Sequence, residues 1–179
     1  EVSELVFWRA RSLVLRLIVS DWAVRAEKDK SGLVGLALAG KTFGIIGMGA
    51  IGTCTAQLTK AFVCRVLGFN RSQKQVEGVR MVELDELLRE SDIVSLHVPL
   101  TEQTRGMIGE REIGLMKPSA ILINTARGPV VDSAALAAAL KEGRLAGAAV
   151  DVYETEPPIP PDHPLLSAPH VAATPPVAL

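Results

Sequence analysis

Gly47-Met48-Gly49-Ala50-Ile51-Gly52 decides the fold, because it has the spacing G-x-G-x-x-G and lies between two periodic segments. Residues 42–46 before it form a short apolar run typical of a buried strand, and residues 51–62 after it have the apolar spacing of a helix. In a strand-turn-helix unit of this kind, the first glycine permits the tight turn, the second lets the backbone approach a pyrophosphate, and the third lets helix and strand pack closely. The stretch therefore predicts a dinucleotide-binding turn.

Strand and helix patterns alternate along the chain beyond this turn. Short apolar runs predict strands at residues 65–69, 79–82, 93–98, 120–124 and 146–150. Helical spacing is found at residues 84–90 and 133–141, the second after the candidate N-cap Asp132. Apolar strands separated by helices predict a parallel sheet that is covered on both faces. The expected fold class is therefore α/β, with a Rossmann doubly wound parallel sheet.

The two ends of the chain differ from this pattern. Residues 2–27 have nearly helical spacing and predict one long helix, whose high apolar content leaves a second face for another domain or subunit. Residues 154–179 hold eight of the eleven prolines, which predicts an extended, irregular segment with one last strand near Val171. We therefore divide the chain into a linking helix over residues 1–30 and a nucleotide-binding Rossmann domain over residues 31–179.

Composition and charge narrow the class of protein. The 179 residues suffice for one domain, and 48% apolar and 22% charged residues are ordinary for a soluble α/β protein. A formal net charge of −1 provides no broad basic surface, so we expect a small-molecule partner and neither nucleic acid nor membrane. Arg16 interrupts the apolar residues 13–19, which are too few to span a membrane, and the expected location is the cytoplasm.

The two cysteines, Cys54 and Cys64, lie ten residues apart, with no C-x-x-C pair and no histidines at zinc-ligand spacing. We expect two buried thiols in a reducing compartment. The cysteines therefore predict neither a metal site nor a disulfide.

A second glycine-rich stretch imitates a different phosphate-binding motif. Residues 35–42, GLALAGKT, satisfy the P-loop pattern G-x-x-x-x-G-K-[ST]. A P-loop follows a strand and opens a helix, whereas this stretch precedes the predicted strand 42–46 and has apolar loop positions. We therefore do not expect a nucleoside triphosphate site here.

The end of the second predicted strand bears on the choice between NAD and NADP. A dinucleotide fold commonly has an acidic residue there, about 20 residues beyond the glycines, that bonds the ribose 2′-hydroxyl. This chain has Asn70 instead, followed by Arg71, Ser72 and Lys74. Without a carboxylate to repel a 2′-phosphate, and with two cations to pair with it, NADP is at least as acceptable as NAD. The same residues are compatible with a solvated basic turn, and both interpretations stay open.

Four ordered blocks of residues carry further information. They are GKTFGIIG at residues 40–47, HVPLT with TRG at residues 97–106, MKP with INTARG at residues 116–128, and GAAVDVYETEP at residues 147–157. Together they resemble the D-isomer-specific 2-hydroxyacid dehydrogenases, which include glyoxylate, hydroxypyruvate and phosphoglycerate enzymes. The resemblance implies an oxidoreductase that acts on the CH–OH group of 2-hydroxy acids and reduces 2-keto acids with NADH or NADPH.

The resemblance also implies roles for individual residues. Arg127 would clamp the substrate carboxylate, Glu156 would pair with a catalytic histidine and raise its pKa, and Asp151 would meet the nicotinamide carboxamide. The implied catalytic residues are thus Arg127 and Glu156. The implied cofactor-binding residues lie in the glycine turn and after the strands: Gly47, Gly49, Ala50, Ile51, Gly52, Asn70, Arg71, Ser72, His97, Val98, Pro99, Thr104, Thr125, Ala126, Arg127 and Asp151.

Two departures from the family pattern limit what the chain is expected to do alone. The family's catalytic histidine follows Thr-Pro near the end of the domain, and here Pro176 follows Thr174-Pro175. His170 comes too early and His163 lies in an ordinary proline-rich loop, so we assign the missing role to neither. The family also builds a substrate domain from both chain ends, and this chain has a cofactor domain without a complete substrate domain. Whether it is a fragment or a shortened relative, we expect little or no turnover.

Other functions and partners stay open beside this interpretation. The main alternative is a non-catalytic module that senses NAD(P) or binds a partner, which cofactor-dependent association without turnover would reveal. A dinucleotide domain of another class, such as an adenosylhomocysteine hydrolase, would share the glycine turn but leave Arg127 and Glu156 unexplained. The resemblance further implies a homodimer formed through the cofactor domain and its first helix. The substrate of the full enzyme would be a small 2-hydroxy or 2-keto acid.

Overall fold

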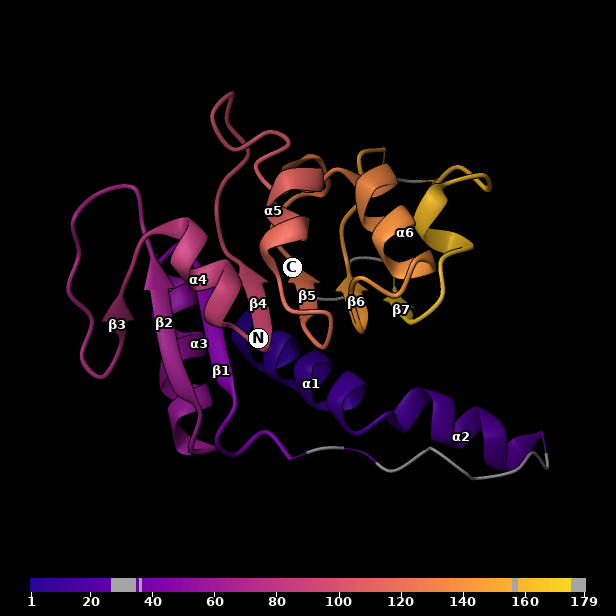
Figure 1. Ribbon diagram of the computed structural model, residues 1–179, viewed down its shortest axis with the longest axis horizontal. Helices are drawn as coiled ribbons and strands as arrows, with labels where there is room; N and C mark the ends of the chain where they lie inside the picture. Colours follow the sequence, from indigo (N-terminus) through magenta and orange to yellow (C-terminus); the bar gives the residue numbers. More distant parts are fainter. Residues whose placement is uncertain (27–34, 36, 156–157, 175–179) are drawn as a thin grey trace.

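Seven parallel strands form one sheet in the computed structural model, which describes residues 1–26, 35, 37–155 and 158–174 (Figure 1). From one side to the other they are β3 (Arg80–Met81), β2 (Arg65–Phe69), β1 (Thr42–Ile46), β4 (Ile93–Leu96), β5 (Ile121–Asn124), β6 (Gly147–Val150) and β7 (Val171–Ala173). β1 pairs with β2 on one side and with β4 on the other, so the chain order reverses between β1 and β4. This is the predicted doubly wound sheet.

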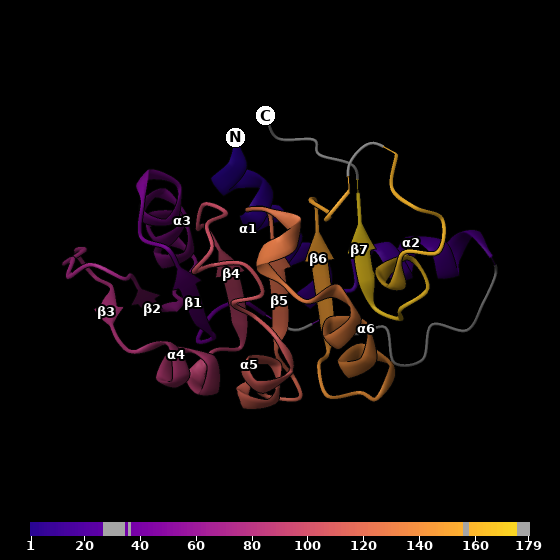
Figure 2. The same ribbon diagram turned by 90° about the horizontal axis from the view of Figure 1, so that it is seen from above.

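Helices cover both faces of the sheet (Figure 2). α1 (Val2–Val14) and α3 (Ala50–Ala61) lie together on one face, while α4 (Leu84–Glu90), α5 (Glu110–Leu115) and α6 (Ser133–Lys141) lie on the other. The sheet thereby separates two apolar cores, one containing Leu122 and Leu136 and the other containing Phe43 and Ile123. Central strands buried on both sides need continuous apolar runs, which is the pattern that predicted them.

The predicted strands, and the helices predicted after the glycine turn, are confirmed with small changes at their ends. β1, β2, α4 and α6 have the predicted bounds, and Asp132 caps α6 as expected. The last predicted strand is β7, and the described part of residues 154–174 is otherwise irregular apart from the 3-10 helix η2 (Pro164–Leu166). Thr42 opens β1, so the P-loop-like stretch leads into a strand and not into a helix.

The single helix predicted over residues 2–27 is wrong, because the described residues of this stretch form α1 and α2 (Leu17–Arg25). The break falls at Arg16, whose φ of 54° lies in the left-handed region. Gly35 packs against the backbone there, since a Cβ on Gly35 would lie 2.5 Å from the Leu15 Cα. Neither glycine nor proline marks the break in the sequence, so periodicity could not place it.

Apolar periodicity does not predict α5, a helix of six residues. Its signal is a local one: Gly109 precedes the helix, and the Gly109 N–H donates to Glu112 Oε2 at 3.2 Å. A Glu three positions after the cap is a known mark of a helix start. The helix is held mainly by Ile113, which is buried in the core beneath it.

The expectation of two buried thiols is wrong for Cys54, which is exposed on α3. The adjacent residues Thr55 and Ala56 take the buried face of that helix, so Cys54 points to solvent. Cys64 is half-buried, and burial raises the pKa of its thiol. Within the described ranges, no group of three or more His, Cys, Asp or Glu side chains is placed to hold a metal ion. No helix there is long and apolar enough to cross a bilayer.

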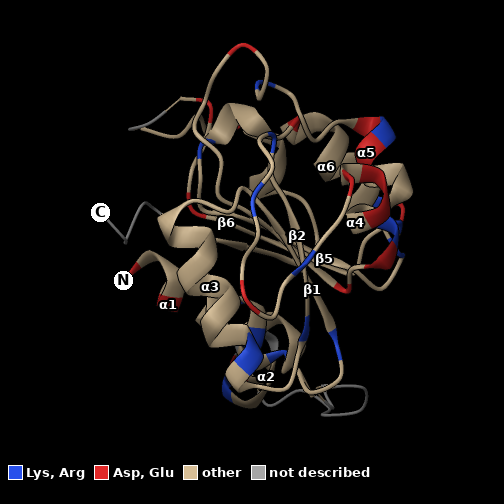
Figure 3. Cartoon of the chain, turned by 90° about the vertical axis from the view of Figure 1, so that its left-hand side faces the viewer, with Lys and Arg blue, Asp and Glu red and all other residues tan. Residues whose placement is uncertain are grey.

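Acidic residues gather on α4 and α5, among basic residues (Figure 3). Arg111 Nη2 lies 2.6 Å from Asp85 Oδ2 and joins the two helices, and Arg89 Nη2 reaches the same oxygen at 3.5 Å. Exposed pairs of this kind each contribute little stability. They do, however, compensate the acidic charge of the two helices.

Candidate functional site

All strands are parallel, so their carboxyl ends meet at one edge, which we call the carboxyl edge. The predicted site residues follow directly after these strands: Gly47 after β1, Asn70 after β2, His97 after β4, Thr125 after β5 and Asp151 after β6. Open α/β sheets bind ligands outside the carboxyl ends of their strands, where the strand order reverses. The fold thus brings together residues that are up to about a hundred positions apart.

The glycine turn has the three local properties that its sequence predicts. Gly47 has a φ of +97°, and a Cβ there would lie 2.5 Å from the His97 carbonyl oxygen and 2.9 Å from Val98 Cγ1. A Cβ on Gly52 would lie 2.1 Å from the Gly47 carbonyl oxygen, so α3 packs this closely on β1 only with glycine. A Cβ on Gly49, by contrast, would meet no atom within 4 Å. The chain therefore needs two glycines for its own packing and has open space beside the third.

Two helices that begin near this edge differ in their first turns. Asp132 caps α6, and its Oδ1 accepts hydrogen bonds from the N–H groups of Ala134 and Ala135, both at 3.0 Å. α3 begins after Gly49, which has no side chain to accept such a bond. N–H groups at a helix start favour an anion, because they carry partial positive charge and lack partners within the helix. The start of α3, with Ala50 and Ile51 in its first turn, can therefore receive a phosphate.

The loop after β2 is tied to the glycine turn. Asn70 Oδ1 accepts a hydrogen bond from the Met48 N–H at 3.2 Å, and Asn70 Nδ2 donates to Ser72 Oγ at 2.9 Å. Arg71 is exposed, and its Nη1 donates at 2.5 Å to Oε1 of Gln103 in the loop after β4. The residues predicted to choose between NAD and NADP therefore lie beside the turn, with one guanidinium at the surface.

The segment after β4 presents a neutral imidazole and a short hydrogen-bonded loop. His97 Nε2 lies 3.0 Å from Ser95 Oγ, and burial lowers the pKa of His97 from its ordinary 6.5 to about 4. The side chain is therefore uncharged at neutral pH. Thr104 Oγ1 donates to the Pro99 carbonyl at 2.7 Å and closes the loop.

The loop after β5 holds an unsatisfied hydroxyl and an exposed arginine. Thr125 Oγ1 is buried and has no hydrogen-bond partner among the described residues. Asn124, which belongs to the INTARG block but received no role from the sequence, fixes the loop: its Nδ2 donates to the Arg127 carbonyl at 3.0 Å, and its Oδ1 accepts from the Ala126 N–H at 3.1 Å. The exposed Arg127 side chain donates from Nη1 to the Ala126 carbonyl at 2.7 Å. Because a buried unpaired hydroxyl is costly, Thr125 indicates a polar group of a ligand.

Asp151 lies in a buried ion pair that the sequence did not reveal. Nη2 of Arg9, on α1, lies 2.8 Å from Asp151 Oδ1, and the two side chains are 1% and 4% exposed. Thr174 Oγ1 bridges them, because it accepts from Arg9 Nη2 and donates to Asp151 Oδ1 at 2.5 Å. Glu156 and Pro176, on which the other predictions for this region depend, lie outside the described residues.

The other two histidines have structural surroundings. His163 Nε2 lies 2.8 Å from Glu154 Oε2, and His163 Nδ1 accepts a hydrogen bond from the Leu165 N–H at 3.3 Å. Burial acts to raise the pKa of Glu154, but hydrogen bonds from Ser133 and His163 lower it overall. His170 is exposed and directly precedes β7, so it lies at the opposite edge of the sheet. The contacts of His163 hold the C-terminal loops, and His170 lies away from the carboxyl edge, so we assign a site role to neither.

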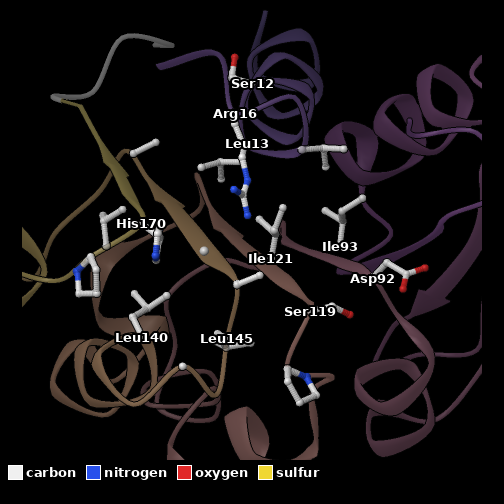
Figure 4. A pocket seen from close by; sticks show the side chains of 18 of the residues that line it. Ser12, Leu13, Arg16, Asp92, Ile93, Ser119, Ile121, Leu140, Leu145 and His170 are labelled. Carbon is white, nitrogen blue, oxygen red and sulfur yellow. The ribbon is translucent and has the colours of Figure 1, made fainter. Parts of the chain in front are cut away.

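A cleft of about 910 Å³ lies at the amino edge of the sheet, where the strands begin (Figure 4). Its lining includes Ser12, Leu13, Asp92, Ile121, Gly147 and His170. Asp92 already has partners there, since it accepts from the Thr42 N–H at 2.8 Å and from Lys117 Nζ at 2.9 Å. Size favours this cleft, but the direction of a parallel sheet favours the other edge. We therefore place the candidate site at the carboxyl edge.

The residues at the carboxyl edge fit a dinucleotide. Open space at Gly49 and the uncapped start of α3 suit a pyrophosphate, the loop after β2 suits a ribose, and the Thr125 hydroxyl has no partner in the part of the chain that the structure describes. A family model described as D-isomer specific 2-hydroxyacid dehydrogenase, NAD binding domain, matches residues 10–178. A glyoxylate reductase from Aeropyrum pernix is 48% identical over 162 residues, which cover 85% of this chain and 48% of that protein. The chain thus spans about half the length of this curated relative.

Solved structures with bound cofactor have the same fold. NAD-dependent formate dehydrogenase from Staphylococcus aureus, in complex with NAD, has a TM-score of 0.93 at 30% identity, covering 98% of this chain and 54% of that one. An acyclic imino acid reductase in complex with NADPH and D-Arg has a TM-score of 0.89 at 34% identity, covering 97% and 56%. Since one family model spans all seven strands and the carboxyl edge of the sheet, this chain belongs to the D-isomer-specific 2-hydroxyacid dehydrogenase family and contains its NAD-binding Rossmann domain.

Proposed function

We propose that this chain is the cofactor-binding part of an oxidoreductase that acts on the CH–OH group of small 2-hydroxy acids and reduces 2-keto acids. The observation that carries the proposal is the start of α3, which has no side-chain cap and open space beside Gly49. A pyrophosphate suits this place because its charge complements the N–H groups and its approach requires a missing Cβ. Bound NADH or NADPH would supply the hydride, and the residues of the chain would bind and orient it.

The proposed roles of individual residues divide between cofactor and substrate. Thr125 Oγ1, which lacks a partner among the described residues, is assigned to a polar group of the cofactor, and Asp151 to the nicotinamide side. Arg127, exposed on a loop that Asn124 holds, is assigned to the substrate carboxylate, because a guanidinium binds carboxylates in a bidentate manner. Glu156 is assigned to pair with a proton donor. Pro176 stands at the family's position for that donor and cannot be the donor itself, since proline has no titratable group.

The cofactor preference is proposed to include NADPH. No carboxylate follows β2, and the exposed Arg71 guanidinium is available at the surface beside the Asn70 loop. Replacing the guanidinium should therefore weaken NADPH binding and leave NADH binding nearly unchanged, because only NADPH carries the 2′-phosphate. Arg71→Ala is the variant that separates the two cofactors.

The test is a parallel titration of the purified 179-residue chain with NADH and NADPH, followed by tryptophan fluorescence and checked by calorimetry. Saturable binding supports the proposed function, and Arg71→Ala then measures the preference for NADPH. A folded chain that binds neither cofactor would contradict the proposal and leave the glycine turn with a structural role alone.

Catalytic turnover by this chain alone is not part of the proposal. We expect no NADPH consumption with glyoxylate, hydroxypyruvate or pyruvate, and steady consumption above the blank would contradict this. Pro176, at the position of the family's histidine, also favours a second candidate, a non-catalytic module that senses NAD(P) or binds a partner. That function predicts association with another protein that changes when NADH is added, measured by sedimentation.

A homodimer through the first two helices is also proposed. Trp8 on α1 is 53% exposed, and on α2 Leu17 is 47% and Val24 is 59% exposed. Exposed apolar side chains on adjacent elements commonly mark an interface. Light scattering should therefore give the mass of two chains, and a monomer at micromolar concentration would count against the dimer. The location in the cytoplasm stays a prediction.

A further inference from the structure

Arg9 is a buried cation whose contacts are incomplete. Its Nη2 serves both Asp151 and Thr174, whereas Nε and Nη1 are buried without a hydrogen-bond partner among the described residues. Burying a guanidinium with two unpaired nitrogens is costly, and apolar residues of similar volume often replace a buried ion pair with no loss of stability. Attachment of α1 to the sheet is therefore a weak explanation for this arginine, and a role for its charge is a stronger one.

The Arg9–Asp151 pair lies at the carboxyl edge, in the half that does not contain the glycine turn. Asp151 follows β6, and its N–H donates to the Asn124 carbonyl at 3.1 Å, next to Thr125. A dinucleotide site consists of two mononucleotide-binding halves. The glycine turn and Asn70 belong to the half built on β1 and β2, which leaves the nicotinamide to the half that contains Asp151.

The two redox forms of a nicotinamide differ in charge at this place. The oxidised ring carries one positive charge and the reduced ring carries none. A buried carboxylate without a cation would attract the oxidised form, because charges in a protein interact through an effective dielectric constant of about 20, well below that of water. Arg9 lies 2.8 Å from the Asp151 carboxylate and cancels its charge.

We propose that Arg9 sets the balance between the two redox forms of the cofactor: by neutralising Asp151, it removes a preference for the oxidised nicotinamide. The inference rests on the proposed function, because it requires a nicotinamide at the carboxyl edge. Compared with a site in which Asp151 keeps its charge, a site with the neutralised pair binds the reduced cofactor more tightly relative to the oxidised one. That balance suits an enzyme that reduces 2-keto acids.

The test measures the dissociation constants of NADH and NAD⁺ by calorimetry for the unmodified chain and four variants, with circular dichroism to verify folding. Arg9→Met removes the cation beside the Asp151 carboxylate, so the affinity ratio should move about tenfold toward NAD⁺. Asp151→Asn leaves a lone guanidinium, so the ratio should move about tenfold toward NADH. Arg9→Met with Asp151→Asn, and Arg9→Lys alone, both keep the net charge and should leave the ratio within about twofold of its original value.

The sign of the shifts separates a charge effect from a structural one. Equal losses of affinity for both redox forms, with the ratio unchanged, would overturn the inference and leave the pair with a structural role. If Arg9→Met does not fold, Asp151→Asn and the double variant still decide, because the ratio must shift in the first and return in the second. Failure of the folded, unmodified chain to bind either form would instead overturn the proposed function.

Discussion

The carboxyl and amino edges of this sheet differ in the groups that they present to a ligand and in the direction of the strands that end there. At the amino edge, a cleft of about 910 Å³ has Asp92 in its wall, and that carboxylate is already bound by the Thr42 N–H and Lys117. At the carboxyl edge, the first turn of α3 has no side-chain cap and the Thr125 hydroxyl has no partner among the described residues. The Ser12 hydroxyl in the wall of the amino-edge cleft also has no partner among the described residues, so unpaired hydroxyls do not separate the edges. The direction of the strands and the open start of α3 are the grounds on which we place the candidate site at the carboxyl edge.

The largest expected effect comes from closing the carboxyl edge at a tight backbone contact. Gly52→Ala places a Cβ 2.1 Å from the Gly47 carbonyl oxygen, so the turn must move. We expect a loss of about 4 kcal/mol in the free energy of unfolding, measured by urea denaturation, and loss of NADH binding. The matched control is Gly114→Ala on α5, where a Cβ meets no atom within 4 Å and alanine should stabilise the helix by about 0.5–1 kcal/mol. Equal stability of the two variants would remove the basis of the packing argument.

The next effect is a pH dependence of the free energy of unfolding, caused by His97 at the carboxyl edge. The folded-state pKa of His97 is lowered by burial to about 4, so protons bind the unfolded chain preferentially between pH 6.5 and 4. This histidine therefore contributes stability that is complete above pH 6.5 and is lost as the pH falls toward 4, by about 3 kcal/mol. Urea denaturation across this range measures the loss, and His97→Asn should flatten the curve. An unchanged slope in that variant would show that another group is responsible.

A smaller effect should appear in binding without a change in folding. Gly49 has an extended backbone conformation that alanine also adopts, and an added Cβ meets no atom of the chain within 4 Å. Gly49→Ala should therefore keep its unfolding midpoint, while its Cβ occupies the space assigned to the pyrophosphate and weakens NADH binding about 30-fold. Calorimetry measures the affinity. Normal NADH binding by this variant would place the cofactor elsewhere.

The smallest expected effect lies at the amino edge. Burial acts to raise the pKa of Asp92, but the Thr42 N–H, Lys117 and Lys41 lower it overall, so its stabilising contribution is present above pH 3.8 and is lost as the pH falls through the lower, folded-state pKa. Asp92→Asn should cost about 1 kcal/mol of stability at neutral pH. NADH affinity should not change, because the residue lies at the edge away from the cofactor. A loss of affinity in this variant would contradict the assignment of the site.

The strands and the glycine turn are predictable from the sequence because their causes are local. Residues 42–46 must be apolar to be buried on both faces, and Gly47 and Gly52 are required by contacts within the turn and with its neighbouring strand. The break between α1 and α2 has no such local cause. It coincides with a contact between Leu15 and Gly35, twenty positions later, which no periodicity reports.

The placement of the candidate residues at one edge of the sheet was predictable from the sequence, and the charge partner of Asp151 was not. Gly49, Asn70, Thr125 and Asp151 follow strands, so the direction of the sheet alone brings them to one edge. The partner of Asp151 could not be foreseen, because Arg9 is 142 positions earlier, inside a stretch that reads as an ordinary apolar helix. Asn124 was missed for a similar reason, since its role is to bond the backbone of the loop after it.

The same span of 142 positions between Arg9 and Asp151 has a consequence for the order of folding. α1 is synthesised before the strands that it covers, yet its buried arginine meets a partner only after β6 has been synthesised, and meets Thr174 later still. Contacts this distant in sequence form late, because the entropy of closing the intervening loop must be offset first. α1 is therefore made before the sheet is complete and docks late, and until then it exposes the apolar face that will cover β5 and β6.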